Sequence, residues 1–305
     1  MVNHEVAVLL AFLGFICGWG LSFSSFSGTL KAMLSALLAR FFIPVVIIYN
    51  MVFYQAGSLS LMLFSFVVAV ALFYLFRCML KDPLSALCVS YVNLAWLGFP
   101  LALALFGESV SAAMVALYIG GSLFGNIWAI TAVSTKAQPL STVIKKVALS
   151  PPVLALAIAL ICRSFGLQHL QHLQHLQQHH GLDLLYSAAK VGMSLTGMCV
   201  LGIWLAHTKV ATRDLWQSSK IFLIKIPLGL IICGLSCFFM PIAHIERAIG
   251  VMFLLFCLPP AANIVALETH YHGTGISAKY IASGTIVSCV VIALYALSLQ
   301  LYSAF

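Results

Sequence analysis

Charged side chains are scarce in this chain: only 7% of its 305 residues are Asp, Glu, Lys or Arg, whereas 63% are hydrophobic. An ordinary soluble domain carries about 25% charged residues, so the composition excludes that class. It also excludes a soluble protein that binds nucleic acid, although the formal net charge is +8. The low charge content predicts an integral membrane protein whose surroundings are the lipid bilayer.

Seven long stretches contain no charged residue at all: residues 6–30, 41–76, 83–107, 109–135, 226–245, 248–267 and 280–305. A helix that spans a bilayer needs about 20 such residues, and lipid requires every backbone hydrogen bond to be made inside the protein. The chain is therefore predicted to be an all-α polytopic membrane protein. Dividing the longest stretch at the turn-forming residues 55–58, we expect ten spans, at residues 6–23, 30–54, 59–77, 83–105, 110–134, 145–165, 183–206, 216–239, 246–268 and 277–301.

The basic residues divide unevenly between the two sets of loops that ten spans create. One side has Arg163 and Arg247, and three more basic residues, Arg40, Lys190 and Lys225, fall within spans. The other side has ten: Lys31, Arg77, Lys81, Lys136, Lys145, Lys146, Lys209, Arg213, Lys220 and Lys279. The positive-inside rule places these ten in the cytoplasm, so both termini are expected on the outer side.

Ten spans divide into two halves of five, residues 1–142 and 143–305, with an outer His/Gln-rich loop at 166–182 in the second half. Because each half has an odd number of spans, the halves run in opposite directions through the membrane. Two halves of similar structure would then form an inverted repeat, which is the plan of many secondary transporters.

The fourth and ninth predicted spans occupy corresponding places in the two halves, and both contain helix-breaking residues near their middle. These residues, with a nearby asparagine in each span, are Asn93, Gly98 and Pro100 in the fourth and Pro259, Pro260 and Asn263 in the ninth. Proline removes an amide donor and clashes with the preceding turn, so both helices are expected to break at mid-depth. Paired interruptions of this kind indicate a transport site.

A broken helix leaves free amides at the start of one half-helix and free carbonyls at the end of the other. The amide ends favour an anionic group, whereas the carbonyl ends and the two asparagine amides suit a cation, a hydroxyl or a second face of the solute. We therefore predict that the six residues named above bind substrate. The alternative is that the prolines only kink their helices.

The two proline-containing stretches resemble those of the auxin efflux carrier family. NLAWLGFPLALALFG (93–107) is similar to its N-x-G-x-x-G-x-P-x-x-x-x-x-F-G stretch, and LPPAANIVALETHY (258–271) to its M-P-x-A-x-N-x-x-x-x-A-x-x-Y stretch. Weaker similarities at 34–52, 145–161 and 194–206 follow in the same order. The resemblance covers nearly the whole chain except 166–182.

This resemblance implies an inverted repeat of ten helices, similar to bile-acid sodium symporters and sodium/proton antiporters, in which helices four and nine are unwound and cross. It implies transport of a small organic acid such as auxin or a dicarboxylate, with Asn93, Pro100, Pro259 and Asn263 lining the crossing.

The chain departs from the family pattern in two places. Ala95 replaces a frequent glycine, and Pro260 replaces a small residue, which predicts a stiffer second crossing. The short loop at 135–144 resembles that of bacterial members rather than long-loop plant carriers. We accordingly expect a multi-pass permease of the cell (inner) membrane.

Three charged residues are candidate charge partners for the substrate. Lys225 lies inside the eighth span and Lys190 inside the seventh; each either attracts an anionic substrate or extends its ammonium group toward the membrane surface. Glu268 follows the proline motif and either titrates during transport or is a solvated helix end.

Enzymatic and metal chemistry find little support in the sequence. The nine cysteines lie in or beside apolar stretches, without the spacing of metal ligands, and are expected to be buried apolar side chains. No H-E-x-x-H motif occurs, and His207, His244, His270 and His272 lie at span ends. We expect no enzyme, no cofactor and no metal site. The repeat QHLQHLQHLQQHH (168–180) is interpreted as a tolerated expansion, with metal binding by its histidines as the alternative.

The leading hypothesis is a secondary transporter that carries a small organic anion by alternating access. The alternatives are a sodium-coupled symporter of the bile-acid-symporter type and a membrane sensor that transports nothing. The sequence does not fix the substrate, the direction of transport, the coupling ion (proton or sodium) or the oligomeric state (monomer or homodimer).

Overall fold

The computed structural model describes residues 4–53, 58–133, 140–165, 181–239, 245–265, 268 and 276–304. Within these ranges the protein is all-α, and the only extended pairing is one isolated bridge. The histidine-rich repeat at 168–180 lies outside the described residues, so the hypotheses about it stay open.

The first part of the chain forms helices that match the apolar stretches. They are α1 (His4–Leu21), α2 (Ser27–Leu37), the π-helical turn η1 (Leu38–Phe42), α3 (Ile43–Val52), α4 (Ser58–Leu80), α5 (Pro83–Ser90), the π-helical turn η2 (Leu94–Gly98), α6 (Phe99–Phe106), the 3-10 turn η3 (Glu108–Val110) and α7 (Ser111–Val133). The remainder forms α8 (Leu140–Ala148), α9 (Pro151–Ser164), α11 (Gly181–Ala206), α12 (Thr212–Phe239), α13 (Ile245–Cys257) and α15 (Ser277–Ala304).

Within the described residues, six helices are long and apolar enough to cross a bilayer: Ser27–Val52, Leu59–Leu80, Glu108–Trp128, Gly181–Ala206, Thr212–Phe239 and Ser277–Leu301. Four shorter apolar helices, Phe12–Leu21, Leu94–Phe106, Pro151–Ser164 and Ala248–Cys257, lie within the other four predicted spans. By helix length and composition the protein is therefore a multi-pass membrane protein.

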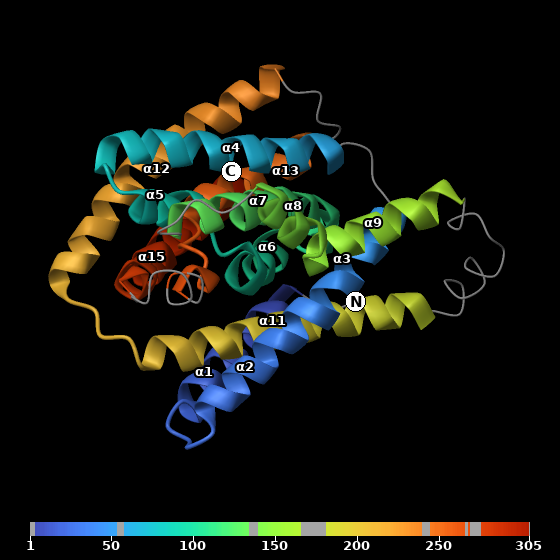
Figure 1. The fold of residues 1–305 in the computed structure, drawn as a ribbon, viewed down its shortest axis with the longest axis horizontal. Helices are drawn as coiled ribbons and strands as arrows, with labels where there is room; N and C mark the ends of the chain where they lie inside the picture. The colour runs from blue at the N-terminus through green and yellow to red at the C-terminus, as the bar shows by residue number, and fades with distance from the viewer. Residues whose placement is uncertain are drawn as a thin grey trace.

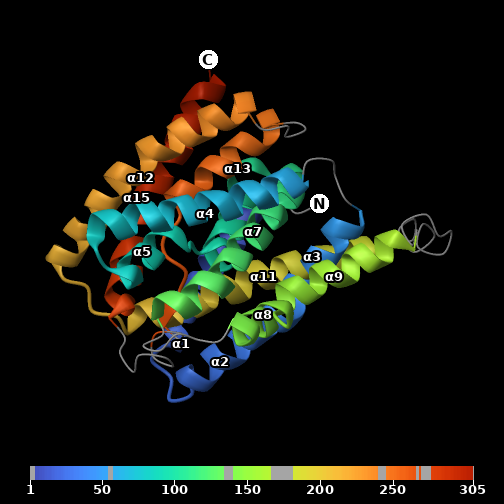
Figure 2. The same cartoon turned by 45° about the horizontal axis from the view of Figure 1, so that its top comes forward.

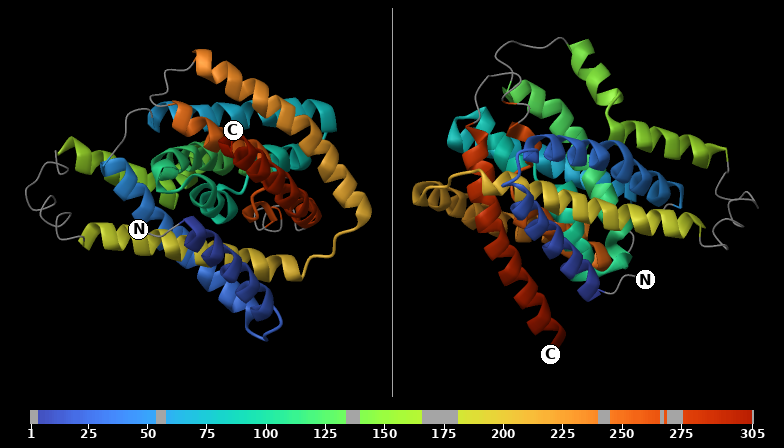
Figure 3. Two further views of the ribbon diagram at one scale, coloured as in Figure 1. Left: turned by 180° about the vertical axis from the view of Figure 1, so that it is seen from behind. Right: turned by 90° about the horizontal axis from the view of Figure 1, so that it is seen from below.

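The helices form two groups that are distinct in Figures 1 and 2. In one, which we call the α11 group, α1 and α2 pack on α11, and α3 packs on α9 and α11. In the other, the α12 group, α4 packs on α5 and α7, while α12 packs on α13 and α15. The short helix α6 and the turn η2 lie between the groups, because α1 contacts α6 and α11 contacts η2. Figure 3 shows the same arrangement from behind and from below.

The α11 group is held together by a close approach of α1 to α11. A Cβ atom added at Gly18 would lie 2.0 Å from the carbonyl oxygen of Cys199, and one added at Gly202 would lie 2.3 Å from that of Phe15. Glycines allow this approach because they remove the side chain that would separate the two backbones. The pair α1 and α11 is thus packed backbone against backbone.

The predicted interruption of the fourth span is present, but it lies before the expected residues. Helix α5 ends at Ser90, and helical structure resumes at Leu94 in the wide turn η2, which continues directly into α6. Gly98 and Pro100 therefore lie inside the second half-helix rather than at the break. The wide π turn accommodates the proline ring and its missing amide within a continuous helix. In the ninth span, α13 ends at Cys257, and Pro259 and Pro260 lie in the non-helical segment as predicted.

Candidate functional site

The interruptions of the two broken helices are paired with each other. The amide of Asn93 donates a hydrogen bond to the carbonyl of Pro259 at 2.8 Å, and the amide of Ala261 donates to the carbonyl of Tyr91 at 2.8 Å. Together they form the isolated antiparallel bridge. An unpaired backbone group is costly in a membrane interior, so each break satisfies part of the hydrogen-bonding capacity that the other leaves free.

Asn93 is the N-cap of the second half of its span. Its Oδ1 atom accepts a hydrogen bond from the amide of Trp96 at 3.1 Å, which satisfies one free amide of η2. Its Nδ2 group is buried and has no hydrogen-bond partner among the residues that the structure describes. The side chain is only 5% exposed. A buried donor without an acceptor is unfavourable, so this amide is suited to an accepting group on a ligand.

A cavity of about 270 Å³ lies against the paired interruptions and is lined by both asparagines; we call it the asparagine cavity. Ser35 of α2 and Tyr118 and Ser122 of α7 also line it. Asn263 is exposed, and its Nδ2 donates to the hydroxyl of Tyr91 at 3.0 Å. The cavity lies between helices of the two groups and close to the range of about 300–1,000 Å³ typical of small-molecule sites.

Lys225 lies beside the interruption of the ninth span, and it does not line the asparagine cavity. Its Nζ donates to the carbonyl of Leu258 at 3.0 Å, at the end of half-helix α13. The residue is only 2% exposed, so the alternative that its ammonium group extends to the membrane surface is wrong. A cation is favourable at the C-terminus of a helix because of the helix dipole, and this explains why the Lys225 ammonium group lies at the end of α13.

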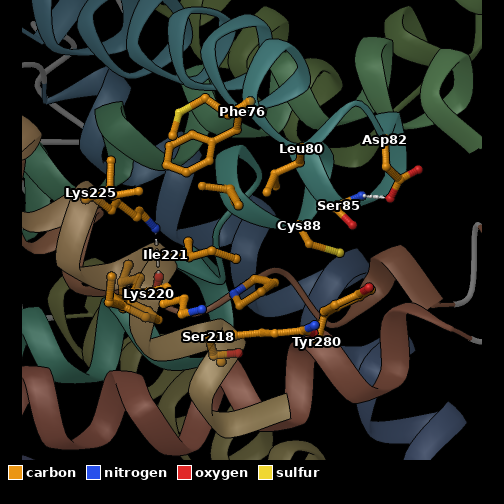
Figure 4. Close-up of a pocket in the computed structure, with 18 residues that line it drawn as sticks. Phe76, Leu80, Asp82, Ser85, Cys88, Ser218, Lys220, Ile221, Lys225 and Tyr280 are labelled. Carbon is orange, nitrogen blue, oxygen red and sulfur yellow. Dashed lines mark hydrogen bonds between the residues drawn. The ribbon is translucent and has the colours of Figure 1, made fainter. Parts of the chain in front are cut away.

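Lys225 lines a second cavity of about 470 Å³, which we call the lysine cavity (Figure 4). This cavity lies between α4, α5, α12 and α15, and Leu258 and Pro260 form its wall at the broken helix. The structure therefore divides the predicted site residues. Asn93 and Asn263 line one cavity, and Pro260 and Lys225 line the other.

The remaining predicted substrate-binding residues have packing roles in this structure. Pro259 contributes its carbonyl to Asn93. Gly98 lies where the second half-helix touches the ninth span, since a Cβ atom there would be 2.7 Å from Cδ1 of Leu258. Pro100 is buried near the start of α6.

Lys190 is buried and forms an ion pair with Glu108. The same ammonium group lies 4.3 Å from the centre of the Tyr186 ring, which also belongs to α11. The hydroxyl of Tyr186 hydrogen-bonds Ser111 of α7 and Asn50 of α3. Lys190 thus joins the two helix groups through Glu108, and its charge is already compensated.

Glu268 is fully buried, so the interpretation as a solvated helix end is wrong. Its carboxylate accepts hydrogen bonds from the amides of Ile276 and Ser277, both at 2.8 Å, and from the Ser277 hydroxyl. These are free amides at the start of α15, where a negative charge is favourable. Glu268 anchors the beginning of α15.

Sequence reasoning missed Tyr91 and Glu108, and it also missed Ser35, Tyr118 and Ser122, which line the asparagine cavity. Tyr91 precedes Asn93 and contacts Asn263, but a tyrosine within an apolar run carries no distinguishing signal. Glu108 was assigned to a loop, and its pairing with Lys190, 82 positions away, follows only from the fold.

Metal ligands do not gather in the described part of the chain, where no three His, Cys, Asp or Glu side chains are placed to hold an ion. Comparison with known proteins finds no family model that matches this chain and no match among curated proteins.

Proposed function

We propose that the protein is a secondary transporter of the auxin efflux carrier type that moves a small organic anion across the cell membrane. Its ten spans would form an inverted repeat of residues 1–142 and 143–305, with both termini outside. It would have no enzymatic activity. The observation that carries the proposal is the buried Nδ2 donor of Asn93, which has no partner among the described residues and belongs to a side chain at the wall of the asparagine cavity.

The ligand chemistry follows from the groups at this cavity. The available donor of Asn93 suits a carboxylate oxygen, and the hydroxyls of Tyr118 and Ser122 lie in the same wall. The cavity volume suits a small acid of the size of a dicarboxylate or a compact aromatic acid. The position between the α11 and α12 groups suits alternating access, because a movement of one group against the other would expose the cavity to either side.

Sodium as the coupling ion finds little support at the helix breaks. The carbonyls of Tyr91, Leu258 and Pro259, which the breaks free for cation binding, accept hydrogen bonds from Ala261, Lys225 and Asn93. A sodium ion at the breaks would have to share these oxygens with existing donors.

The test is uptake of a panel of labelled small carboxylates by proteoliposomes, with wild-type protein and with Asn93→Ser, at several pH values and in sodium or choline buffer. We expect saturable uptake of at least one acid that is unaffected by sodium and strongly reduced in the variant. Uptake that depends on sodium would favour the symporter. Binding of an acid without any flux would favour a sensor and contradict the proposal.

A further inference from the structure

We propose that the lysine cavity is a second anion-binding site, separate from the asparagine cavity, for a carboxylate that carries an apolar body. This inference does not depend on the transport function, because the two cavities share no lining residue.

The first observation is a buried cation without a counter-ion. Lys225 is 2% exposed, and no carboxylate of the described residues forms an ion pair with it. An ammonium group has three donors, and the carbonyl of Leu258 accepts only one of them. Burying a charge is costly unless it is paired and hydrogen-bonded. The ammonium group also lies 5.4 Å from the centre of the Phe222 ring, which carries no charge. The two remaining donors are therefore available to an anion in the adjoining cavity.

Two other charged side chains line the cavity, Asp82 and Lys220, and both already have other partners. Lys225 is therefore the group that would bind an anion. Asp82 lies across the cavity from Lys225 in Figure 4, and its carboxylate accepts hydrogen bonds from the amides of Leu84 and Ser85 at the start of α5. Lys220 directs its ammonium group to the exposed ring of Trp216, 5.3 Å from the ring centre.

The rest of the wall selects the body of the ligand. Most of the cavity surface is apolar, and Phe76 and Leu80 of α4 and Ile221 and Phe222 of α12 contribute to it. Its volume of about 470 Å³ falls in the range of small-molecule sites, which combine an apolar lining with a few placed polar groups. A carboxylate head on Lys225 with an aliphatic or aromatic body along this wall satisfies both features. Such an acid is either water-soluble or derived from lipid.

The experiment measures binding to purified full-length protein in phosphatidylcholine nanodiscs by isothermal titration calorimetry. The probes are 4-phenylbutyrate, the fatty acid laurate and the neutral 4-phenylbutyramide. We expect saturable binding of at least one acid and none of the amide. The affinity should fall at least about tenfold in Lys225→Met, because a charge-assisted hydrogen bond is lost, and should be unchanged in Asn93→Ser. Binding of phenylbutyrate identifies a soluble ligand, and binding of laurate alone identifies a lipid-derived one.

A second variant keeps the test decisive if Lys225→Met fails to fold. Ile221→Phe adds ring volume to the cavity wall without changing charge, and Leu223→Phe on the exposed face of α12 is its matched control. Weaker binding in Ile221→Phe alone supports the proposal. Three outcomes overturn the proposal. They are an unchanged affinity in both Lys225→Met and Ile221→Phe, a loss of affinity in Asn93→Ser instead, and no binding of either acid. The uptake assay on Asn93 can succeed or fail independently of these results.

Discussion

The amide of Asn93 donates a hydrogen bond to the carbonyl of Pro259 across the two interrupted helices, at 2.8 Å. The two residues are far apart in the sequence, yet each completes the backbone of the other's break. The same asparagine also caps its own half-helix through Oδ1, while its Nδ2 is buried without a partner among the described residues. Its backbone, its oxygen and its nitrogen therefore have three different roles.

The two side-chain roles of Asn93 can be separated by substitution. Serine is as good an N-cap as asparagine, but it does not extend an amide group into the cavity. We expect Asn93→Ser to melt close to the wild type while losing most of its affinity for the transported acid. Asn93→Ala should lose the affinity and also about 1 kcal/mol of stability, the usual cost of a removed cap. Thermal melting and ligand titration of both variants would check this, and retention of full affinity in both would contradict the role of Nδ2.

The ion pair between Lys190 and Glu108 should contribute to stability through the buried cation. Glu108→Gln leaves the Lys190 ammonium group without its counter-ion, and we expect a loss of about 1–2 kcal/mol, below the 3–5 kcal/mol of a fully buried pair because the Glu108 side chain is 44% exposed. Adding Lys190→Met should restore most of the loss. A double-mutant cycle measured by thermal or denaturant unfolding gives the coupling. Additive effects would show that the pair has no energetic coupling.

Glu268 should behave as an anchor of α15 rather than as a carrier of protons. Glu268→Ala removes the acceptor for two backbone amides and should cost about 2–3 kcal/mol, since hydrogen bonds to a charged group are stronger than neutral ones. Glu268→Gln keeps one carbonyl acceptor and should be intermediate in stability while retaining transport. Hydrogen exchange at residues 276–279 should quicken in the alanine variant. Complete loss of uptake in a stably folded Glu268→Gln would instead indicate titration.

The close approach of α1 and α11 predicts a sharp difference between two glycines of the same helix. Gly18→Ala would bring a Cβ atom to 2.0 Å from the Cys199 carbonyl, so the helices must separate, at a cost of about 3 kcal/mol. Gly20→Ala meets no atom within 4 Å and should be neutral or slightly stabilising. Melting temperatures of the two variants provide the comparison. Equal melting temperatures would contradict the close packing.

The all-α class and the six helices of membrane-spanning length were predicted because long apolar stretches form helices that satisfy their hydrogen bonds in lipid. The other four predicted spans contain shorter apolar helices. The proline-containing segment at 259–260 was also placed correctly, since Pro259 and Pro260 in succession cannot continue a regular helix. The first break was placed too late because Pro100 is accommodated by the wide turn η2, and a π turn leaves no mark in composition.

Side-chain partners were less predictable than helices. Asn93 was predicted to bind the substrate and Lys225 to be a charge partner for it, but the two residues line different cavities. Glu268 looked like a helix end exposed to solvent, and its burial depends on the amides of Ile276 and Ser277 eight and nine residues further on. Such contacts depend on the tertiary fold, and local sequence patterns carry no information about it.

The backbone contact between Gly18 and Cys199 has a consequence for how the protein is made. About 180 residues separate Gly18 from Cys199, and a ribosome adds roughly 5–20 residues per second. Helix α1 therefore enters the membrane roughly 10–40 s before α11 is available. During that interval its glycine face, which is shaped for another backbone, lacks the helix that packs on it. Assembly of this protein thus requires α1 to keep this face available for α11 after its other partner, α6, has been made.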